Sequence, residues 1–445
     1  MARTCAILPC VGGPLRWSAF AVPAAVLAAV LATVLTNATA AATAEPARWR
    51  WETAAGFDAT VHTYALAVDD TTETISEFML EAALEGRSDR SASRRWRLRA
   101  DASAGTELYR QRVDGDWRLL GDGGHTPVRV DGGLAARQYR RGTEYVYSSD
   151  SWEGRLDVRT QPVAWPGALL EVRARGGLQD YRTPSTLEVD WRQAAAGLYL
   201  RSRRPADRWW SVGVGALRRT YPDTAAIDRD QLGLELDWDS GALGDGGLRL
   251  HHKSERREVA DETARPSAWS HWTDLAAAVP AGPGRVVAEV QSEVWRYDTE
   301  DAAWFDSWRL DGLLGYRWGD ILAASWLVGL AAERLDAGDN PDSYRQWGAR
   351  AGVDAFGLGL SGSLTVEYGH RDYLDPAITL DADGLTETFG LYSDFAYWKV
   401  WLTGSWRLAA PLTLEALASW EPERHTEQAD DSSLGFATLR LVWRP

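Results

Sequence analysis

Hydrophobic residues recur at every second position along most of the chain after residue 45. The clearest runs are residues 49–63, 284–296, 303–318 and 358–368, where one parity is apolar and the other is polar or charged. Successive side chains of a β-strand point to opposite faces, so this period predicts strands with one apolar and one polar face. An amphipathic helical period is hard to find past residue 45. The pattern therefore predicts an all-β fold.

The connections between these runs come in two lengths. Short turns, such as 281–284 and 409–411, alternate with longer acidic loops, such as 257–266 and 335–343. This alternation is typical of an up-and-down barrel with tight turns at one end and surface loops at the other. The runs predict strands near residues 47–63, 76–87, 94–110, 134–147, 151–161, 168–178, 186–202, 208–219, 228–239, 246–257, 266–279, 284–297, 303–317, 320–334, 343–356, 358–370, 397–409, 411–421 and 432–443, with one more between 113 and 131. We therefore expect a single antiparallel transmembrane β-barrel of about 18–20 strands over residues 45–445. An even number of strands is typical of bacterial barrels of this kind.

Alternation alone does not say which face is wet, because a soluble sandwich also alternates with its apolar face inward. The aromatic content favours a membrane protein. The chain has Trp 24, Tyr 15 and Phe 8, and Trp and Tyr are preferred where one end of the ring is wet and the other apolar. Tryptophans also lie near the ends of predicted strands, as interfacial girdles require: Trp49, Trp51, Trp152, Trp238, Trp269, Trp304, Trp318, Trp420 and Trp443. A transmembrane barrel is thus favoured over a soluble sandwich, propeller or β-helix.

The N-terminus has the pattern of an export signal. Arg16 precedes an apolar run over residues 18–35, which leads into small residues that end at Ala44. A basic residue, an apolar run and small residues in this order are typical of a cleaved signal peptide. We therefore predict a signal peptide over residues 1–44. The alternative is an uncleaved membrane anchor, because the run is close to spanning length.

The last predicted strand alternates apolar or small residues up to an aromatic: Gly435, Ala437, Leu439, Leu441 and Trp443. In this respect the chain resembles the porin-like class of bacterial outer-membrane β-barrels, whose assembly machinery reads such a strand. The chain departs from the pattern in ending with Arg444-Pro445 after the aromatic. The resemblance covers everything after about residue 45, and it implies the outer membrane of a Gram-negative bacterium. It also implies the lipid bilayer, lipopolysaccharide and the outer-membrane assembly machinery as partners.

The polar parity carries charges of both signs. If the apolar parity faces lipid, the polar parity lines the interior, and the pore-lining candidates are Arg95, Arg97, Arg99, Glu153, Arg155, Asp157, Arg159, Glu171, Arg173, Arg175, Glu289, Glu293, Arg309 and Asp311. A barrel of about 16–20 strands leaves an aqueous channel unless something fills it. Acidic and basic residues on facing walls would then filter solutes by charge. Cross-strand ion pairing is the alternative interpretation of the same residues, and it is compatible with a wet lumen.

Spare length for a plug is limited. The first predicted strand begins near Trp49, so no separate plug domain is expected. The loop over residues 371–396 would either fold into the lumen as a constriction or cap it in solvent. The acidic loops are interpreted as solvated surface, or as bridges through divalent ions to lipid phosphates.

Several functional classes are disfavoured. The net charge of -15 argues against a nucleic-acid partner. Cys5 and Cys10 both precede the predicted mature chain, which leaves no disulfide, thiol chemistry or cysteine zinc site. Neither G-x-S-x-G nor H-E-x-x-H occurs, and His251 and His252 would point to opposite faces of a strand. We therefore predict no catalytic residue, no metal and no cofactor.

Together these observations predict an outer-membrane β-barrel channel for the passive or facilitated passage of small polar solutes. One alternative is an accessory barrel of an export or electron-transfer complex whose partner chain fills the lumen. A second alternative is a lipid-modifying barrel enzyme.

Overall fold

The computed structural model describes residues 48–443, apart from gaps at 67–70, 90–93, 106–108, 122–127, 140–150, 183–188, 204–207, 242–245, 264, 321, 339–341, 358, 375–376, 383–384, 391–392 and 427–430. Side chains are described from residue 128 onward, outside those gaps and outside residues 137–139, 301 and 377–390. The predicted signal peptide over residues 1–44 lies outside the described residues, as does the terminal Arg444-Pro445.

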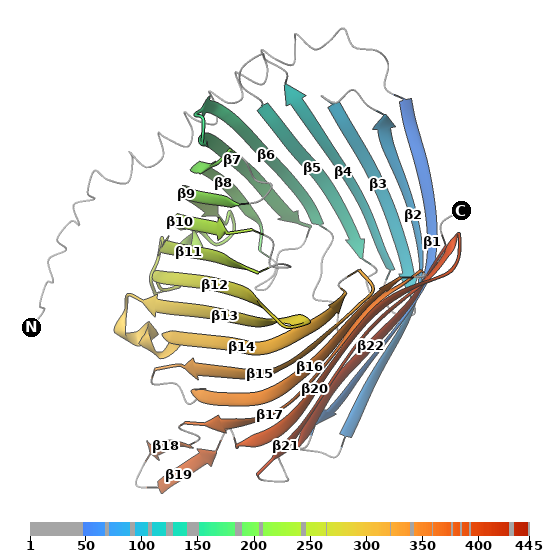
Figure 1. Ribbon diagram of the computed structural model, residues 1–445. Helices are drawn as coiled ribbons and strands as arrows, with labels where there is room; N and C mark the ends of the chain where they lie inside the picture. Colours follow the sequence, from blue (N-terminus) through green and yellow to red (C-terminus); the bar gives the residue numbers. More distant parts are fainter. Residues whose placement is uncertain are drawn as a thin grey trace, which may run out of the picture.

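In the described part of the chain, twenty antiparallel strands form one sheet. They are β1 (Arg48–Leu66), β2 (Thr71–Asp89), β3 (Arg94–Gly105), β4 (Tyr109–Gly121), β5 (Val128–Tyr139), β6 (Ser151–Ala164), β7 (Ala168–Tyr181), β8 (Trp191–Ser202), β9 (Trp209–Thr220), β10 (Arg229–Asp239), β11 (Gly247–Val259), β12 (Ala268–Ala281), β13 (Gly284–Tyr297), β14 (Ser307–Asp320), β15 (Ala324–Asp336), β16 (Tyr344–Gly357), β17 (Leu360–Tyr373), β20 (Phe395–Ala409), β21 (Leu412–His425) and β22 (Ser432–Trp443). Figure 1 shows them following one another in chain order around a ring. Among the described residues, two short 3-10 helices, η1 (Ala225–Ile227) and η2 (Glu300–Phe305), lie in loops. In the described part of the chain, no helix is both long and apolar enough to cross a membrane.

The sheet closes on itself through its first and last strands. β1 pairs with β2 along one edge and with β22 along the other, where residues 55–65 lie opposite residues 433–443. Every other strand of the ring pairs with the strands before and after it, and β17 pairs with β20. Each described strand of the ring therefore has a partner on both edges. This satisfies the backbone N–H and C=O groups internally, as a hydrocarbon environment requires.

Most of the strands lie where the alternation predicts them, including 284–297 and 432–443. The strand predicted near 134–147 is wrong in position, because β5 spans Val128–Tyr139. Asp131-Gly132-Gly133 has the composition of a turn, but in the structure it lies within β5, with Gly133 opposite Asp116 of β4. The strand predicted near 303–317 begins too early, because η2 occupies the residues before Ser307.

The long connection after β17 is more ordered than the sequence predicts. Within the span 371–396, β18 (Ala377–Ala382) pairs with β19 (Leu385–Gly390) as a separate hairpin. Figure 1 shows this hairpin beyond the ends of β17 and β20 rather than across the ring. The structure therefore favours an extension of the rim over a constriction formed by this loop.

The longer connections share one end of the barrel, and a repeated hydrogen bond fixes their shape. Each of these connections joins two neighbouring strands. The side chain of the residue just before the second strand accepts a hydrogen bond from a backbone N–H at the end of the first strand. The donor is either the last residue of the first strand or the residue just after it. The donor and acceptor pairs are Tyr181 with Asp190 (2.6 Å), Tyr221 with Asp228 (2.7 Å), Val259 with Ser267 (3.1 Å), Tyr297 with Asp306 (2.7 Å), Ala337 with Ser343 (2.9 Å), Tyr373 with Asp394 (2.8 Å) and His425 with Asp431 (2.8 Å). We call this contact the rim clasp. Asp431, at the end of an acidic loop, therefore has a structural role besides the solvated one predicted for the acidic loops.

The rim clasp at Asp431 is expected to open in acid. Arg424 Nη1 donates to Asp431 Oδ2 (2.8 Å) and the His425 N–H donates to Oδ1 (2.8 Å), and these bonds lower the pKa of the Asp431 carboxyl below its ordinary 3.8. With a lowered pKa, the clasp contributes stability above the ordinary pKa and loses it as pH falls through the folded value. Hydrogen exchange at the His425 amide, corrected for intrinsic rate, should accelerate as pH drops from about 5 to about 2. In Asp431→Asn, which cannot titrate, that acceleration should be absent.

Candidate functional site: a hollow in the lumen wall

The two faces of the closed sheet differ in polarity. On one face, charged residues lie opposite each other across strands, as Asp157 of β6 lies opposite Arg175 of β7 and Arg350 of β16 opposite Glu367 of β17. The other face is apolar and more open: Leu314 is 58% exposed, whereas Glu367 is 4% exposed. Side chains converge inside a ring and diverge outside it, so the polar face is the inner one. We call this inner face the lumen wall.

The register places the predicted pore-lining residues on this face. Those with described side chains are Glu153, Arg155, Asp157 and Arg159 in β6, Glu171, Arg173 and Arg175 in β7, Glu289 and Glu293 in β13, and Arg309 and Asp311 in β14. Arg95, Arg97 and Arg99 lie in β3, where Arg97 is opposite Asp116 and Arg99 opposite Asp114 of β4. The side chains of these three arginines are outside the described ones.

The candidates on β13 and β14 bond residues outside the predicted set, whereas those on β6 and β7 bond one another. On β13 to β15, Arg309 Nε bonds Glu333 Oε1 (2.7 Å), while Glu293 accepts from Trp295 Nε1 of its own strand (2.6 Å). On β6 and β7, by contrast, predicted residues bond one another. The sequence candidates therefore do not converge on a single site.

Four arginines share two carboxylates on β6, β7 and β8. Asp157 bonds the Nε atoms of Arg159 (2.7 Å) and Arg175 (2.8 Å). Glu171 bonds Arg173 Nε (2.5 Å) and Arg201 Nη2 (2.7 Å), and its side chain is only 3% exposed. Each carboxylate thus lies between two guanidinium groups, and the cluster has a positive excess. We call these four arginines the arginine wall.

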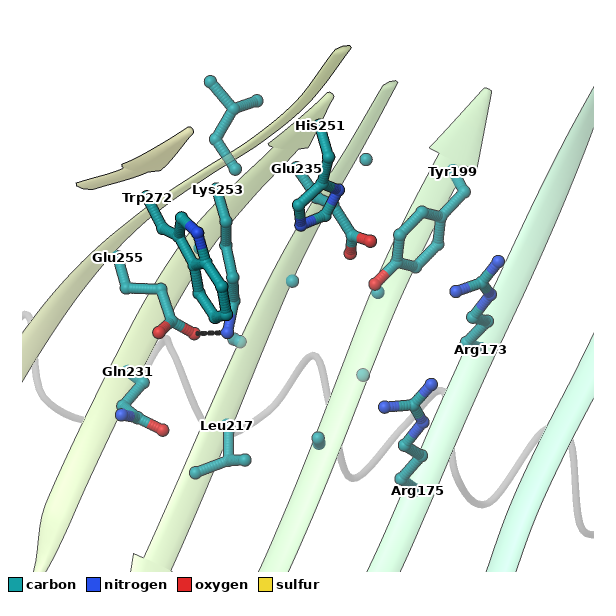
Figure 2. Close-up of a pocket in the computed structure, with 18 residues that line it drawn as sticks. Arg173, Arg175, Tyr199, Leu217, Gln231, Glu235, His251, Lys253, Glu255 and Trp272 are labelled. Carbon is teal, nitrogen blue, oxygen red and sulfur yellow. Dashed lines mark ion pairs between the residues drawn. The ribbon is translucent and has the colours of Figure 1, made fainter. Parts of the chain in front are cut away.

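Next to the arginine wall is a hollow of about 470 Å³ in the lumen wall. Its floor is made by small residues, because Gly197 of β8, Gly215 of β9 and Gly233 of β10 lie in one cross-strand row. The same row begins with Arg173 of β7 and ends with Glu255 of β11. Figure 2 shows the open space between the arginines and the side chains of β10, β11 and β12. Three successive glycines therefore separate a basic from an acidic side chain.

Tyr199 of β8 closes one end of the floor. Its ring lies over Gly213 of β9, and the Arg173 guanidinium carbon stacks 3.9 Å from the ring centroid. A Cβ at Gly213 would overlap the Tyr199 ring, and one at Gly197 would lie 2.8 Å from it. Glycine is thus required at these two positions by a close aromatic contact. At Gly233 the nearest atom to an added Cβ is 3.6 Å away, so the floor there is open.

Replacing Gly213 with alanine should expel the Tyr199 ring from its position. Overpacking of this kind typically costs about 1–3 kcal/mol of unfolding free energy. In a Tyr199→Ala background the same Gly213→Ala change should cost much less, because the overlapping ring is gone. Urea unfolding of the wild type and the three variants in detergent micelles measures this coupling. Equal costs in both backgrounds would contradict the contact.

The opposite side of the hollow carries carboxylates, and we call it the acidic wall. His251 Nδ1 and Asp237 Oδ1 are 2.7 Å apart, and Lys253 Nζ bonds Glu255 Oε1 of its own strand (2.8 Å). Lys253 lies directly across from Glu235 in the register but is paired with Glu255 instead. In the described part of the chain, Glu235 has neither a hydrogen bond nor an ion pair. Figure 2 shows its carboxylate directed into the space between His251 and Tyr199.

Glu235, Asp237 and His251 also have the donor types of a metal site. Each offers one ligand atom, and these atoms lie within 4.8 Å of one another. One imidazole and two carboxylates suit a divalent transition metal. As expected from strand geometry, His252 lies on the other face, where its Nδ1 is 2.8 Å from Thr273 Oγ1.

Sequence reasoning did not single out Tyr199, Glu235, Lys253 or Glu255. Only the alternation of the sequence gives information about them. Continued through 228–239 and 246–257, it places Glu235, Lys253 and Glu255 on the polar face. The glycine row had no signal in the sequence. The row depends on the register of three strands relative to one another, and this register cannot be predicted from the order of the strands in the sequence.

No protein-family model matches the chain, and no curated protein matches it. Solved structures do match. The copper transporter OprC has a TM-score of 0.51 at 10% identity, covering 89% of this chain and 80% of that one. A mutant of the ferric enterobactin receptor PfeA from Pseudomonas aeruginosa has a TM-score of 0.50 at 8% identity, covering 88% and 80%. OccK5 from Pseudomonas aeruginosa has a TM-score of 0.42 at 13% identity, covering 89% and 98%.

At these identities the likeness concerns the fold. Together with the closed antiparallel sheet, it defines the class: this chain has the fold of a large outer-membrane β-barrel. The predicted fold class is thereby confirmed, and the number of strands is at the upper end of the predicted range.

Proposed function

We propose that this protein is an outer-membrane channel of a Gram-negative bacterium, through which small polar solutes pass by passive or facilitated diffusion. The observation that carries the proposal is the inverted polarity of the closed sheet. Leu314, Leu330 and Trp347 are 58%, 68% and 60% exposed on the outer face. Charged pairs such as Arg350 with Glu367 lie on the inner face. That arrangement suits lipid outside and water inside. A ring of this many strands is wide enough for an aqueous channel.

The lumen wall fits a filter rather than a catalyst. Its charges are organised as opposed basic and acidic groups around the hollow, which would act on passing solutes through a transverse field. The two solved structures with the higher TM-scores are a copper transporter and a ferric enterobactin receptor, and neither name is that of an enzyme. Lipid, lipopolysaccharide and the barrel-assembly machinery are the partners we propose for the outer face and for folding.

Planar-bilayer recording of the purified protein tests the proposal. Steady ion-conducting steps are expected, with conductance rising in proportion to salt concentration as in a water-filled pore. A silent barrel that copurifies with another chain would instead support the accessory role, in which a partner occupies the lumen. Silence without any copurifying chain would overturn both. Turnover of lipid substrates in detergent would support the enzyme alternative.

A further inference from the structure

The hollow lies between walls of opposite charge. From the arginine wall, Arg173 and Arg175 line the hollow. The four arginines of this wall outnumber by two the carboxylates that they share, Asp157 and Glu171. From the acidic wall, Glu235 and Glu255 line the hollow with one lysine, and Asp237 lies behind them, bonded to His251. A solute in the hollow therefore meets a positive potential on one side and a negative potential on the other.

Each wall has a group available to a solute. Arg175 is bonded through Nε to Asp157, but its side chain is 52% exposed, so its terminal nitrogens can donate to another anion. Glu235 has no hydrogen bond or ion pair among the described residues, and Lys253, which lies opposite it in the register, is bonded to Glu255 instead. A partly buried carboxylate without a partner is unfavourable, and a cationic group on a ligand would relieve that cost.

The floor sets the spacing between the two walls. Neighbouring strands lie about 4.8 Å apart, so Arg173 on β7 and Glu255 on β11 are about 19 Å apart along the sheet, and both have long side chains that shorten the gap. The glycines between them add no side chain. The remaining space and the volume of about 470 Å³ fit a small molecule with separated charges rather than a single ion.

We infer that the hollow is a binding site for zwitterionic solutes of amino-acid or short-peptide type, with the carboxylate at Arg175 and the ammonium at Glu235. The inference rests on the proposed channel function and names the class of solute that the lumen wall selects. A purely anionic solute would engage only the arginine wall, and a purely cationic one only the acidic wall. Both charges on one molecule are needed to engage both.

Direct binding to the purified barrel in detergent tests this, because the measurement does not require conduction. The probe is the dipeptide alanyl-alanine, compared with N-acetyl-alanyl-alanine, which has only the carboxylate, and alanyl-alanine amide, which has only the ammonium. Titration calorimetry or equilibrium dialysis should show the zwitterion binding at least tenfold more tightly than either derivative. Equal affinity of all three, or no binding of any, would overturn the inference.

Two matched pairs of variants locate the site. Gly233→Val would fill the open floor, and Gly352→Val is its control, since both are lumen-wall glycines whose added Cβ has no neighbour closer than 3.6 Å. Arg175→Gln removes the anion contact, and Arg309→Gln removes an arginine of similar exposure that is away from the hollow. Tenfold weaker dipeptide binding is expected for the first member of each pair only. Equal losses in both members would place binding elsewhere.

The outcome is separable from that of the proposed function. A barrel that conducts ions but binds the three compounds equally refutes the zwitterion site and leaves the channel intact. A barrel that binds the dipeptide selectively but does not conduct refutes the channel and leaves the site.

Discussion

Leu314→Arg is expected to lower the free energy of unfolding by about 2–4 kcal/mol, which is the cost of an arginine at the bilayer midplane on the lipid face of a barrel. Leu314 lies in the middle of β14 and is 58% exposed on the outer face. The physical reason is that the guanidinium would have to enter hydrocarbon. Equilibrium unfolding in urea from lipid vesicles measures the loss.

The matched control is Gln291→Arg, on the lumen wall of the neighbouring strand β13. Gln291 lies opposite Asp311 in the register, so the new arginine would meet water and a carboxylate. Less than about 1 kcal/mol should be lost, as for an exposed ion pair. If the two substitutions cost the same, or if the lumen variant costs more, the assignment of the two faces is wrong.

Arg350→Met is expected to destabilise the barrel by about 3–5 kcal/mol, because it leaves a buried carboxylate without its countercharge. The Glu367 side chain is 5% exposed, and it accepts hydrogen bonds from Arg350 Nε (2.6 Å) and Tyr397 Oη (2.6 Å). These residues join β16, β17 and β20 across the lumen wall. Urea unfolding in detergent or lipid again gives the magnitude.

A second arginine on the same two strands provides the control. Arg345 bonds Asp372 at 3.0 Å, directly across from β16 to β17. This pair lies at the rim end of the two strands, on the opposite face from Arg350 and Glu367, and the Arg345 side chain is 66% exposed. Arg345→Met should therefore cost no more than about 1 kcal/mol. Adding Glu367→Gln to the Arg350→Met variant should restore part of the loss, because the buried group is then neutral. A double variant as unstable as Arg350→Met alone would show that lost packing, not the charge, is responsible.

The fold was predictable because two separate features of the sequence, the alternation of apolar residues and the composition of the turns, both indicate a barrel. Alternation sets the strands, and turn composition sets their ends, as in Gly282-Pro283 between β12 and β13. Prediction failed where one signal contradicted the other. Asp131-Gly132-Gly133 reads locally as a turn, but the ladder between β4 and β6 holds it as strand.

The site was predictable only in part. Parity places Arg173, Arg175 and Glu171 on the lumen wall, and cross-strand pairing of charges was an expected alternative for them. The alternation does not predict with which neighbouring residue a charged side chain forms an ion pair. Lys253 bonds Glu255 two residues along its own strand rather than Glu235 across from it, and that choice creates the free carboxylate in the hollow.

The pairing of β1 with β22 joins the first and last strands of the ring. Until β22 arrives, β1 has an unsatisfied row of N–H and C=O groups along one side, and such an edge readily recruits foreign strands. Contacts between segments so distant along a chain form late and slowly. An incomplete chain is therefore an open sheet with two unpaired edges, and each edge can pair with another chain until β22 meets β1.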